Sequence, residues 1–259
     1  MLRLDAIRKT FARGTPNAKQ ALAGITFTLE PGEFAIVIGG NGAGKSTLLN
    51  AVAGSIRPDE GAIWIDGEAV TQQREEQRAR AVSRVFQDPM VGTAPSLTVE
   101  ENLALAEMRA VGAGLRPALT HARRQRYRDH LAPLKLGLEE RMTIAAGALS
   151  GGQRQSLALA MATIATPRVL LLDEHTAALD PRTAEIVLAA TVRLVADAHL
   201  TALMVTHNMR HAVEAGSRVI MMDAGTIRVD IAGAEKSRLS VEDLVARFHI
   251  SDDKLLLSR

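Results

Sequence analysis

The stretch from Gly39 to Thr47 constrains the fold of this chain more than any other. It reads Gly-Gly-Asn-Gly-Ala-Gly-Lys-Ser-Thr and fits the spacing Gly-x-x-x-x-Gly-Lys-Ser. The apolar run 34–38 precedes it and the mostly apolar segment 48–53 follows it. This context predicts a strand, a glycine-rich loop and a helix. Glycines allow a tight loop with inward N–H groups, which together with the positive end of the helix form a cradle for an anion.

The polar side chains of this stretch match the chemistry of a nucleoside triphosphate. Lys45 supplies a positive charge for the β- and γ-phosphates, and the Ser46 hydroxyl can ligate Mg²⁺. The alternative is a glycine-rich turn with a surface lysine, but the complete spacing between strand and helix favours nucleotide binding. The residues of the loop that we expect to contact the nucleotide are Gly39, Asn41, Gly42, Gly44, Lys45 and Ser46.

Composition narrows the class of protein further. Of 259 residues, 47% are hydrophobic and 23% are charged, which favours a folded chain of one large domain or two small ones. The absence of cysteine excludes disulfides and Cys-ligated metals. With a formal net charge of only +2, no nucleic-acid partner is expected. The N-terminus lacks a signal-peptide pattern and no apolar run is long enough to span a bilayer, so we expect a chain that is soluble or is attached to a membrane only through a partner.

Short strands are predicted in the first third of the chain. Residues 2–7 and 25–29 alternate apolar and polar side chains, as half-exposed antiparallel strands do. Residues 61–67 form a strand that ends in an Asp-Gly hairpin turn. The Arg-, Gln- and Glu-rich segment 71–81 predicts a solvated helix, because its interleaved glutamates and lack of aromatics disfavour a nucleic-acid patch. A further short strand is expected at 82–86.

From residue 96 to about residue 146 the sequence becomes helical in period. Thr98 and Glu101 have the spacing of a capping box at the start of a helix. The segment 121–130 is strongly basic, which indicates either an exposed helix face or a contact with a membrane protein or anionic headgroups. This block predicts a helical insertion into an α/β core.

The last third returns to the pattern of an α/β core. The apolar runs 169–172 and 202–205 are flanked by helical patterns, as buried parallel strands are. Residues 218–229 predict a final hairpin. The tail from residue 240 predicts a short amphipathic helix with apolar positions Val241, Leu244, Val245 and Phe248.

Two carboxylates follow the first of these runs. Asp173 stands at the carboxyl end of the predicted strand, where a chain with a phosphate loop places its Mg²⁺ partner. Glu174 is placed to polarise the water that attacks the γ-phosphate, as a general base. The alternative is an ordinary strand-end turn, which the preceding apolar run and the phosphate loop disfavour.

The segment 149–153, Leu-Ser-Gly-Gly-Gln, predicts a second helix start with phosphate chemistry. Ser150 can act as the N-cap, and neither Gly151 nor Gly152 has a side chain to block an anion. The alternative is a simple Ser-capped helix. A single triphosphate can use both helix starts only if they converge, within one chain or between two.

With these motifs in order, the sequence resembles the ATPase subunits of ATP-binding cassette (ABC) transporters over almost its full length. The matching segments are 39–47 (Walker A), Gln87 (Q-loop), 149–153 (signature), 169–174 (Walker B and catalytic glutamate), 178–180 (D-loop), His207 (switch histidine) and Phe11 (adenine-stacking aromatic). The implied fold is α/β, a P-loop NTPase core with an antiparallel β subdomain and an inserted α-helical subdomain.

The resemblance implies that two copies pair head to tail with ATP between Walker A of one and the signature of the other. In that arrangement Ser150, Gly151, Gly152 and Gln153 serve the γ-phosphate of ATP on the opposite copy. The two helix starts of one chain then belong to two composite sites.

The resemblance also implies roles for single residues. Thr47 assists at the α-phosphate, and Gln87 contacts Mg²⁺ or the attacking water and relays nucleotide state to the helical block. Asp180 crosses the dimer seam, and Phe11 stacks on adenine. His207 holds the γ-phosphate and Glu174, although a lone histidine after a buried strand is more often structural.

Two positions depart from the family pattern. His175 stands where most relatives have proline, and Asn208 follows the switch histidine where an acidic residue is common. Neither change removes a reacting group. Both resemble a subgroup of import ATPases assigned to tryptophan, tyrosine or uncharacterised substrates.

The implied organisation is a single ABC ATPase domain. Residues 1–87 and 149–235 form the nucleotide-binding core with its antiparallel layer, 88–148 the helical subdomain, and 236–259 a short C-terminal helix. The expected partners are a second, identical ATPase subunit, transmembrane permease subunits on which the helical block docks, and a periplasmic or surface substrate-binding protein. The expected location is peripheral, at the cytoplasmic face of the cell membrane.

The leading hypothesis is therefore the energy-coupling ATPase of an importer for a small solute such as an amino acid. A second hypothesis is a soluble ABC ATPase without a transport role, for example in Fe–S cluster assembly. A third is a P-loop kinase acting on a small molecule, which the signature and Glu174 disfavour.

Overall fold

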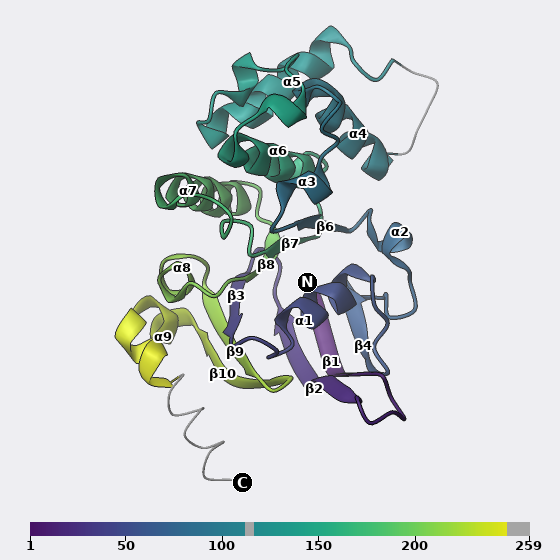
Figure 1. The fold of residues 1–259 in the computed structure, drawn as a ribbon, viewed down its shortest axis with the longest axis vertical. Helices are drawn as coiled ribbons and strands as arrows, with labels where there is room; N and C mark the ends of the chain where they lie inside the picture. Colours follow the sequence, from purple (N-terminus) through teal and green to yellow (C-terminus); the bar gives the residue numbers. More distant parts are fainter. Residues whose placement is uncertain (112–116, 248–259) are drawn as a thin grey trace. The chain divides into compact units, whose positions relative to one another are not determined.

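The computed structural model describes residues 1–111 and 117–247 (Figure 1). The chain forms two compact units. The first unit contains Met1–Arg78 and the chain from Thr201 onward, and the second contains Ala79–Leu200. The predicted helical subdomain at 88–148 falls within the second unit, and its boundaries remain a prediction.

The first unit contains an antiparallel sheet with the order β2-β1-β4-β5. These strands are β1 (Leu2–Phe11), β2 (Lys19–Leu29), β4 (Glu60–Ile65) and β5 (Glu68–Ala69). In β1 the side chains of Leu2, Leu4 and Ile7 are buried, so one face of this sheet carries the apolar residues. The predicted antiparallel strands and the hairpin at the Asp-Gly turn are confirmed.

The same unit contains four further strands in the order β10-β9-β3-β8. They are β3 (Phe34–Gly39), β8 (Thr201–Val205), β9 (Arg218–Asp223) and β10 (Thr226–Ala232). β3 runs parallel to both β8 and β9, and its residues 34–38 are all buried. A continuous apolar run is what a strand covered on both faces requires. β9 and β10 form the predicted final hairpin.

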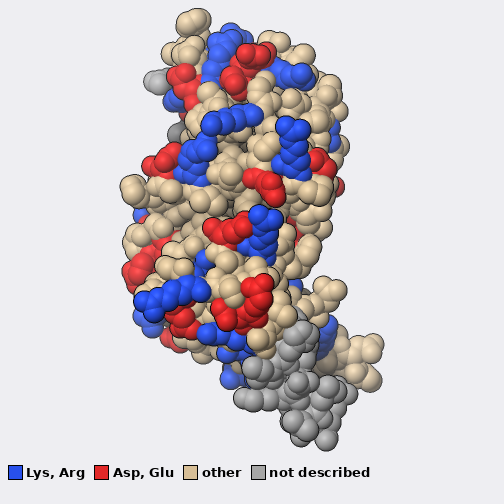
Figure 2. Space-filling model, turned by 90° about the vertical axis from the view of Figure 1, so that its left-hand side faces the viewer, with Lys and Arg blue, Asp and Glu red and all other residues tan. Residues whose placement is uncertain are grey.

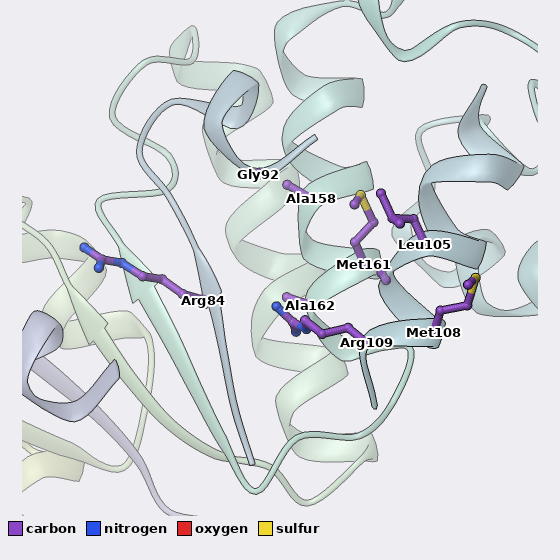
Figure 3. A pocket seen from close by; sticks show the side chains of 9 residues that line it. Arg84, Gly92, Leu105, Met108, Arg109, Ala158, Met161 and Ala162 are labelled. Carbon is purple, nitrogen blue, oxygen red and sulfur yellow. The ribbon is translucent and has the colours of Figure 1, made fainter. Parts of the chain in front are cut away.

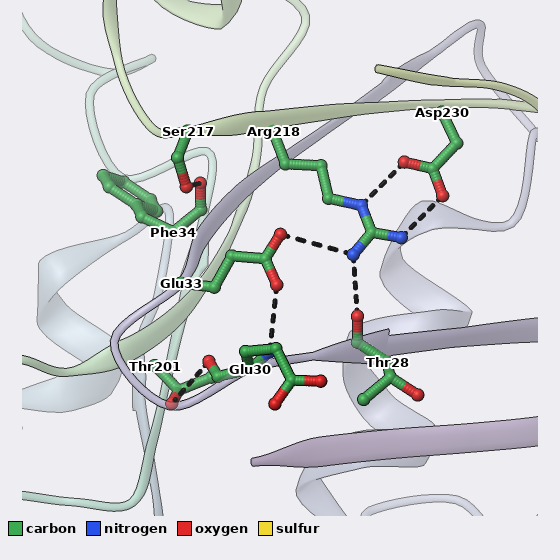
Figure 4. A network of polar contacts seen from close by, with 8 residues as sticks. All are labelled: Thr28, Glu30, Glu33, Phe34, Thr201, Ser217, Arg218 and Asp230. Carbon is green, nitrogen blue, oxygen red and sulfur yellow. Dashed lines mark hydrogen bonds and ion pairs between the residues drawn. The ribbon is translucent and has the colours of Figure 1, made fainter. Parts of the chain in front are cut away.

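Arg218 at the start of β9 holds several segments of the first unit together (Figure 4). Its guanidinium donates to both carboxylate oxygens of Asp230 at 2.6 Å, to the Thr28 carbonyl at 2.7 Å and to Glu33 at 3.3 Å. A planar guanidinium suits this arrangement because its donors form a rigid fork. The network therefore links β10, β2 and the turn that leads into β3.

The segment 71–81 differs from its prediction. Only Glu75–Arg78 (α2) is helical, and Arg78 is buried rather than solvated. Its Nη1 donates to the carbonyls of Ala51 at 2.6 Å and Val52 at 2.9 Å, at the end of helix α1 (Lys45–Ala53). The last carbonyls of a helix have no partner within the helix. The arginine is drawn inward because it supplies these missing donors.

The second unit contains the parallel pair β6 (Val82–Val85) and β7 (Val169–Asp173). Two long helices, α6 (Gly151–Thr163) and α7 (Pro181–Asp197), belong to the same unit. Residues 169–172 of β7 are fully buried, which confirms the prediction of a buried parallel strand.

The rest of the second unit is helical, as predicted. Its helices are α3 (Pro89–Gly92), α4 (Val99–Val111) and α5 (His121–Leu131), and short 3₁₀ segments lie at Ala132–Leu134, Leu138–Glu140 and Ala146–Ala148. The Glu101 carboxylate accepts hydrogen bonds at 2.8 Å from the Thr98 amide and hydroxyl, which confirms the predicted capping box.

The basic segment of α5 forms internal ion pairs. Arg124 pairs with Glu100 at 2.9 Å, and Arg123 and Arg126 pair with Glu107 of α4. Figure 2 shows Lys and Arg side chains interspersed with Asp and Glu on the displayed face. These pairs favour the exposed helix face over a headgroup contact, since pairing within the unit neutralises the arginine charges.

Two more short helices, α8 (Met209–Glu214) and α9 (Gly233–Ser237), belong to the first unit. Residues 241–247 are also helical, and Leu244 is buried there as predicted. Phe248 lies outside the described residues. Within the part of the chain that the structure describes, none of the helices is long and apolar enough to cross a membrane.

Candidate functional site

The glycine-rich loop connects β3 to α1 in the first unit, as the sequence predicts. Gly39 and Gly44 have φ angles of 154° and 100°, and Gly44 is the N-cap of α1. A Cβ at Gly39 would lie 2.2 Å from the Met222 carbonyl oxygen, and one at Gly44 would lie 2.3 Å from that of Ala21. The loop therefore keeps its shape only with glycine at both positions.

Lys45 is the first residue of α1, and its side chain turns back over the loop. The Nζ atom donates to the carbonyls of Gly39 at 2.8 Å and Gly40 at 3.1 Å, and the residue is buried. The neighbouring Ser46, Asn41 and Gly42 are exposed, and Thr47 is half-buried. An ammonium group is thus held at a helix N-terminus beside exposed polar groups, which suits phosphate binding.

His207 follows the carboxyl end of β8. β3 and β8 are parallel with Val37 opposite Val205, and the Thr206 amide donates to the Val37 carbonyl at 3.1 Å. The side chain of His207 is exposed. The structure thus places the predicted switch histidine at the carboxyl end of the strand next to β3, and β3 leads into the phosphate loop.

Phe11 also lies near the loop, because its strand partner Lys19 reaches Gly42. Sequence reasoning did not identify Lys19. Phe11 ends β1 opposite Lys19 of β2, and 42% of its surface is exposed. The Lys19 Nζ lies 3.5 Å from where a Cβ of Gly42 would be. Lys19 therefore adds a second positive charge at the loop. No motif marks this lysine in the sequence, because the pairing of two strands positions it.

In the second unit the structure brings together Gln87, Asp173 and Glu174. β6 and β7 are parallel with Val85 opposite Leu172. Gln87 follows two residues after Val85, and Asp173 and Glu174 follow Leu172. The exposed Gln87 and the half-buried carboxylates thus lie at the carboxyl ends of two paired parallel strands.

Asp173 has a partner that sequence reasoning did not identify. The Nη2 of Arg84 donates to Asp173 Oδ2 at 2.5 Å. The two residues are 89 positions apart in the chain, so only the pairing of their strands reveals the contact.

The residues after Asp173 turn sharply. Glu174 has a φ of 44°, in the left-handed region that side chains rarely adopt. His175, the first departure from the family pattern, is buried and its Nε2 lies 3.0 Å from the Thr191 hydroxyl of α7. Since that hydroxyl donates to the Val187 carbonyl, Nε2 is the donor to Thr191. A histidine here anchors the turn to α7, which proline could not do.

Ser150 is the N-cap of α6, as predicted. The Gln153 amide donates to Ser150 Oγ, and the Ser150 amide donates to Gln153 Oε1, both at 3.3 Å. Gly151 is exposed, but Gly152 is buried, and a Cβ there would lie 2.1 Å from the Thr183 methyl carbon. The position of Gly152 thus packs against α7, and the expected contact of both glycines with a phosphate stays a prediction.

Asp180 caps α7 in the same region. The Thr183 amide donates to Asp180 Oδ1 at 3.1 Å. Hydrogen bonds from the Thr183 side chain and amide hold the pKa of Asp180 below its ordinary value. The D-loop aspartate therefore stays ionised, and Thr183 joins it to the start of the signature helix.

Two further residues that sequence reasoning missed support the signature. Arg154 donates to the carbonyls of Ala146, Gly147 and Leu149, which directly precede Ser150. Gln155 donates to the Phe86 carbonyl at 3.1 Å, next to Gln87. The signature helix thus holds both its own entry loop and the strand end that carries Gln87.

These residues fit ATP and Mg²⁺. The loop presents a shape that only glycines allow, a buried ammonium and a helix N-terminus, which together accept a polyphosphate. Among residues 1–111 and 117–247 no cluster of three or more His, Cys, Asp and Glu side chains could hold a metal ion. The Ser46 hydroxyl of the first unit and the Asp173 carboxylate of the second unit are each an oxygen donor of the kind that Mg²⁺ accepts when it is bound mainly through substrate phosphates. The fold and these residues define a P-loop ATPase.

Comparison with known proteins identifies the family. The ABC transporter family matches residues 22–177. The tyrosine transport ATP-binding protein of Clostridioides difficile (strain R20291) is 43% identical over 251 residues, covering 96% of this chain and 98% of the relative. The thiamine import ATP-binding protein ThiQ of Salmonella choleraesuis (strain SC-B67) is 37% identical over 78% of this chain and 81% of its own length.

The structural comparison agrees. A dimeric post-hydrolysis state of the ATP-binding cassette MJ0796 bound to ADP and Pi matches with a TM-score of 0.77 and 28% identity, over 90% of this chain and 98% of that one. The chain belongs to the ABC transporter family. It is an ABC ATPase with the predicted α/β P-loop fold, it binds ATP, and its hydrolysis of ATP is coupled to transport. Such ATPases work as dimers with transmembrane permease subunits.

Proposed function

We propose that this chain is the energy-coupling ATPase of an importer for a small solute, of the amino-acid class. Two identical copies pair head to tail around two ATP molecules. Closure of the dimer on ATP and its reopening after hydrolysis drive the permease between conformations, because ATP binds the closed state more tightly. The name of the tyrosine transport relative supports the solute class, and the name of the thiamine import relative supports the direction of transport.

The observation that carries the proposal is the presence of two anion-binding helix starts in one chain. α1 begins after Gly44 with a buried lysine, and α6 begins after Ser150 with an exposed Gly151. Each first turn contains an exposed residue, Ser46 or Gly151, and the N-terminal amides of a helix attract phosphate. Each ATP then lies between α1 of one copy and Ser150 to Gln153 of the other.

Each residue of the site has a proposed task. Lys45 and the loop amides hold the phosphates, and Thr47 assists at the α-phosphate. Ser46, Asp173 and Gln87 hold Mg²⁺, which neutralises phosphate charge when bound. Asp180 crosses the dimer seam, and Phe11 stacks on adenine. These tasks fit the exposure of Ser46, Gln87 and Asp180.

The chemistry belongs to Glu174 and His207. Glu174 accepts a proton from the attacking water as the water adds to the γ-phosphorus and the ADP oxygen leaves. His207 orients the γ-phosphate and Glu174. The strained backbone of Glu174, with its φ of 44°, holds the carboxylate at the strand end.

A groove in the second unit is the proposed docking site for the permease (Figure 3). It encloses about 470 Å³ among α3, α4 and α6 and is lined mostly by apolar side chains, including Leu105, Met108 and Met161. Methionine adapts its shape to a partner. Leu105 is 52% exposed, so an apolar segment of a transmembrane subunit can cover it.

Further partners and the location follow from this function. A periplasmic or surface substrate-binding protein delivers the solute, and the ATPase is peripheral at the cytoplasmic face of the cell membrane. A role in Fe–S cluster assembly without a permease is the alternative. The similarity to a tyrosine transport protein over 96% of the chain supports the transport function.

The first test of this function uses Glu174→Gln. We expect loss of steady-state ATP hydrolysis together with an ATP-bound dimer that persists in size-exclusion chromatography, because the amide cannot accept the proton. Lys45→Ala is the matched variant, and it should lose binding of a fluorescent ATP analogue. Normal hydrolysis by Glu174→Gln would contradict the assignment of the general base.

The second test concerns the groove. Leu105→Glu should leave ATP binding intact but reduce co-purification with the permease at least tenfold, because a buried charge opposes docking. Ile186→Glu is the control, since Ile186 is 36% exposed on α7 outside the groove. Equal loss of co-purification in both variants would count against this docking site.

A further inference from the structure

Asp173, the proposed Mg²⁺ ligand, forms an ion pair with Arg84. The Nη2 of Arg84 lies 2.5 Å from Asp173 Oδ2, and the side chains are only 13% and 17% exposed. A pair so shielded from solvent interacts more strongly than a surface pair, because water screens it less. One oxygen that could face a metal is thus committed to a cation of the protein itself.

Neighbouring contacts hold Arg84 in the position in which it meets Asp173. Its strand partner is Leu171, two residues before Asp173, in the parallel register of β6 and β7. Its Cζ lies 4.8 Å from the centre of the Phe86 ring, which holds the guanidinium over an aromatic face. In Figure 3 the guanidinium extends away from Arg109 and Met161, although the residue lines the same groove.

Arg109 provides the contrast. It lines the same groove, but its Nη2 donates to the Ser83 hydroxyl at 2.8 Å. Two arginines therefore lie in one region, and the Arg84 guanidinium donates to Asp173 whereas that of Arg109 donates to Ser83.

We propose that Arg84 is an internal counter-ion that competes with Mg²⁺ for Asp173. The proposal rests on the proposed function, in which Asp173 is a metal ligand. Through this ion pair Arg84 neutralises the carboxylate. To bind the metal, Asp173 must release Arg84 or interact with both cations at once. A guanidinium and a divalent cation that lie side by side repel each other. Arg84 thereby raises the Mg²⁺ concentration that the subunit needs before it retains nucleotide.

If Arg84 instead helped Asp173 to bind the metal, its removal would change the Mg²⁺ requirement in the opposite direction. If Arg84 served only to orient Asp173 for the metal, its removal would weaken Mg²⁺ binding, as the loss of outer contacts to ligands generally does. The direction of the change in Mg²⁺ requirement therefore decides between competition and orientation.

The experiment measures the affinity of the purified subunit for a fluorescent ADP analogue as Mg²⁺ is titrated, so that no hydrolysis is involved. We compare Arg84→Met with Arg109→Met, which removes the same charge from the same groove. Arg84→Met should lower the half-saturating Mg²⁺ concentration about fivefold, at the lower end of typical coupling between two ligands. Arg109→Met should leave it unchanged.

Folding is checked separately, because Arg84→Met leaves Asp173 without its partner. We expect a lower melting temperature than that of the wild type in EDTA, and a larger gain on adding Mg²⁺ with ADP. Arg84→Lys keeps the positive charge, so its Mg²⁺ requirement should stay close to that of the wild type even if its stability falls.

An unchanged or higher Mg²⁺ requirement in Arg84→Met would overturn the competition, as would an equal decrease in Arg109→Met. The proposed function is tested independently by Asp173→Asn. If Mg²⁺ strengthens nucleotide binding in the wild type but not in Asp173→Asn, Asp173 is the metal ligand whatever Arg84→Met shows. If Mg²⁺ acts equally on both, the proposed role of Asp173 fails, and the competition fails with it.

Discussion

Gly152 lies directly against Thr183, so the first turn of α6 packs on the first turn of α7. A Cβ at position 152 would approach the Thr183 methyl carbon to 2.1 Å, far inside van der Waals contact. The next nearest atoms of Thr183 lie at 3.5 Å and 3.9 Å, which are ordinary distances. The signature and the D-loop thus pack closely, because the Thr183 methyl group fills the space that a side chain at position 152 would need.

Gly152→Ala should therefore destabilise the protein by about 1–3 kcal/mol, the usual cost of overpacking. Urea unfolding measures the change. The double variant Gly152→Ala, Thr183→Ser removes the clashing methyl group and keeps the hydroxyl near Asp180, so it should recover most of the lost stability.

Gly151→Ala is the matched control, because the nearest atom to its Cβ, in Leu179, lies at 3.7 Å. Its stability should stay within about 0.5 kcal/mol of the wild type or rise slightly, since alanine favours helix. If both glycine variants lose the same stability, the close contact with Thr183 is not the cause.

The second prediction concerns Arg78 and its effect on stability at the end of α1, the helix that follows the phosphate loop. Its guanidinium donates to Ala51, Val52 and Thr71 carbonyls, and burial lowers its pKa to about 10, so it is still charged at neutral pH. Arg78→Met fills similar space but leaves these acceptors unpaired, which should cost about 2–3 kcal/mol in urea unfolding.

The control for this change is Arg74→Met. Arg74 is exposed and lies four residues earlier, so its loss should change stability by less than about 0.5 kcal/mol. A small effect of Arg78→Met, similar to that of the control, would mean that water can replace the guanidinium at the end of α1.

Tyr127 gives a prediction that depends on pH. Burial, and then the hydrogen bond of 2.7 Å to Glu107, raise its pKa to about 12. Because an unfolded tyrosine titrates near pH ~10, its stabilising effect is fully present below that pH and is lost as the pH rises toward 12. Tyr127→Phe should be less stable than the wild type by about 1–3 kcal/mol at pH ~8, and the difference should shrink above pH ~10.

The absorbance of tyrosinate can follow this titration directly, because the sequence contains only one tyrosine. In the stability measurements, the comparison with Tyr127→Phe removes the effect of lysines and arginines that titrate in the same range, because both proteins contain them. A titration of the folded protein centred near that of free tyrosine would show that the hydroxyl is not held by Glu107.

Local patterns were sufficient to predict the elements that carry the site. The glycine loop between β3 and α1, the capping box at Thr98, the N-cap at Ser150 and the buried strand β7 all depend on residues close together in the chain. Their geometry follows from periodicity and short-range hydrogen bonds. The family could be predicted for the same reason, since each of its motifs is a short local segment.

The sequence could not reveal the side chains that support those motifs. Arg78 lies in a segment with the composition of a solvated helix, yet it reaches a carbonyl 27 positions away. Arg84 finds Asp173 across 89 positions because β6 and β7 pair in one register. A side chain at Gly152 would meet Thr183 of another helix.

The sequence by itself thus determined which loops, strands and helix starts exist, because hydrophobic period and capping are local. Only the tertiary structure decided which charge neutralises Asp173, where Arg78 is buried and why position 152 must be glycine. These outcomes depend on strand register and on helix packing, and both bring together residues that no spacing in the chain relates.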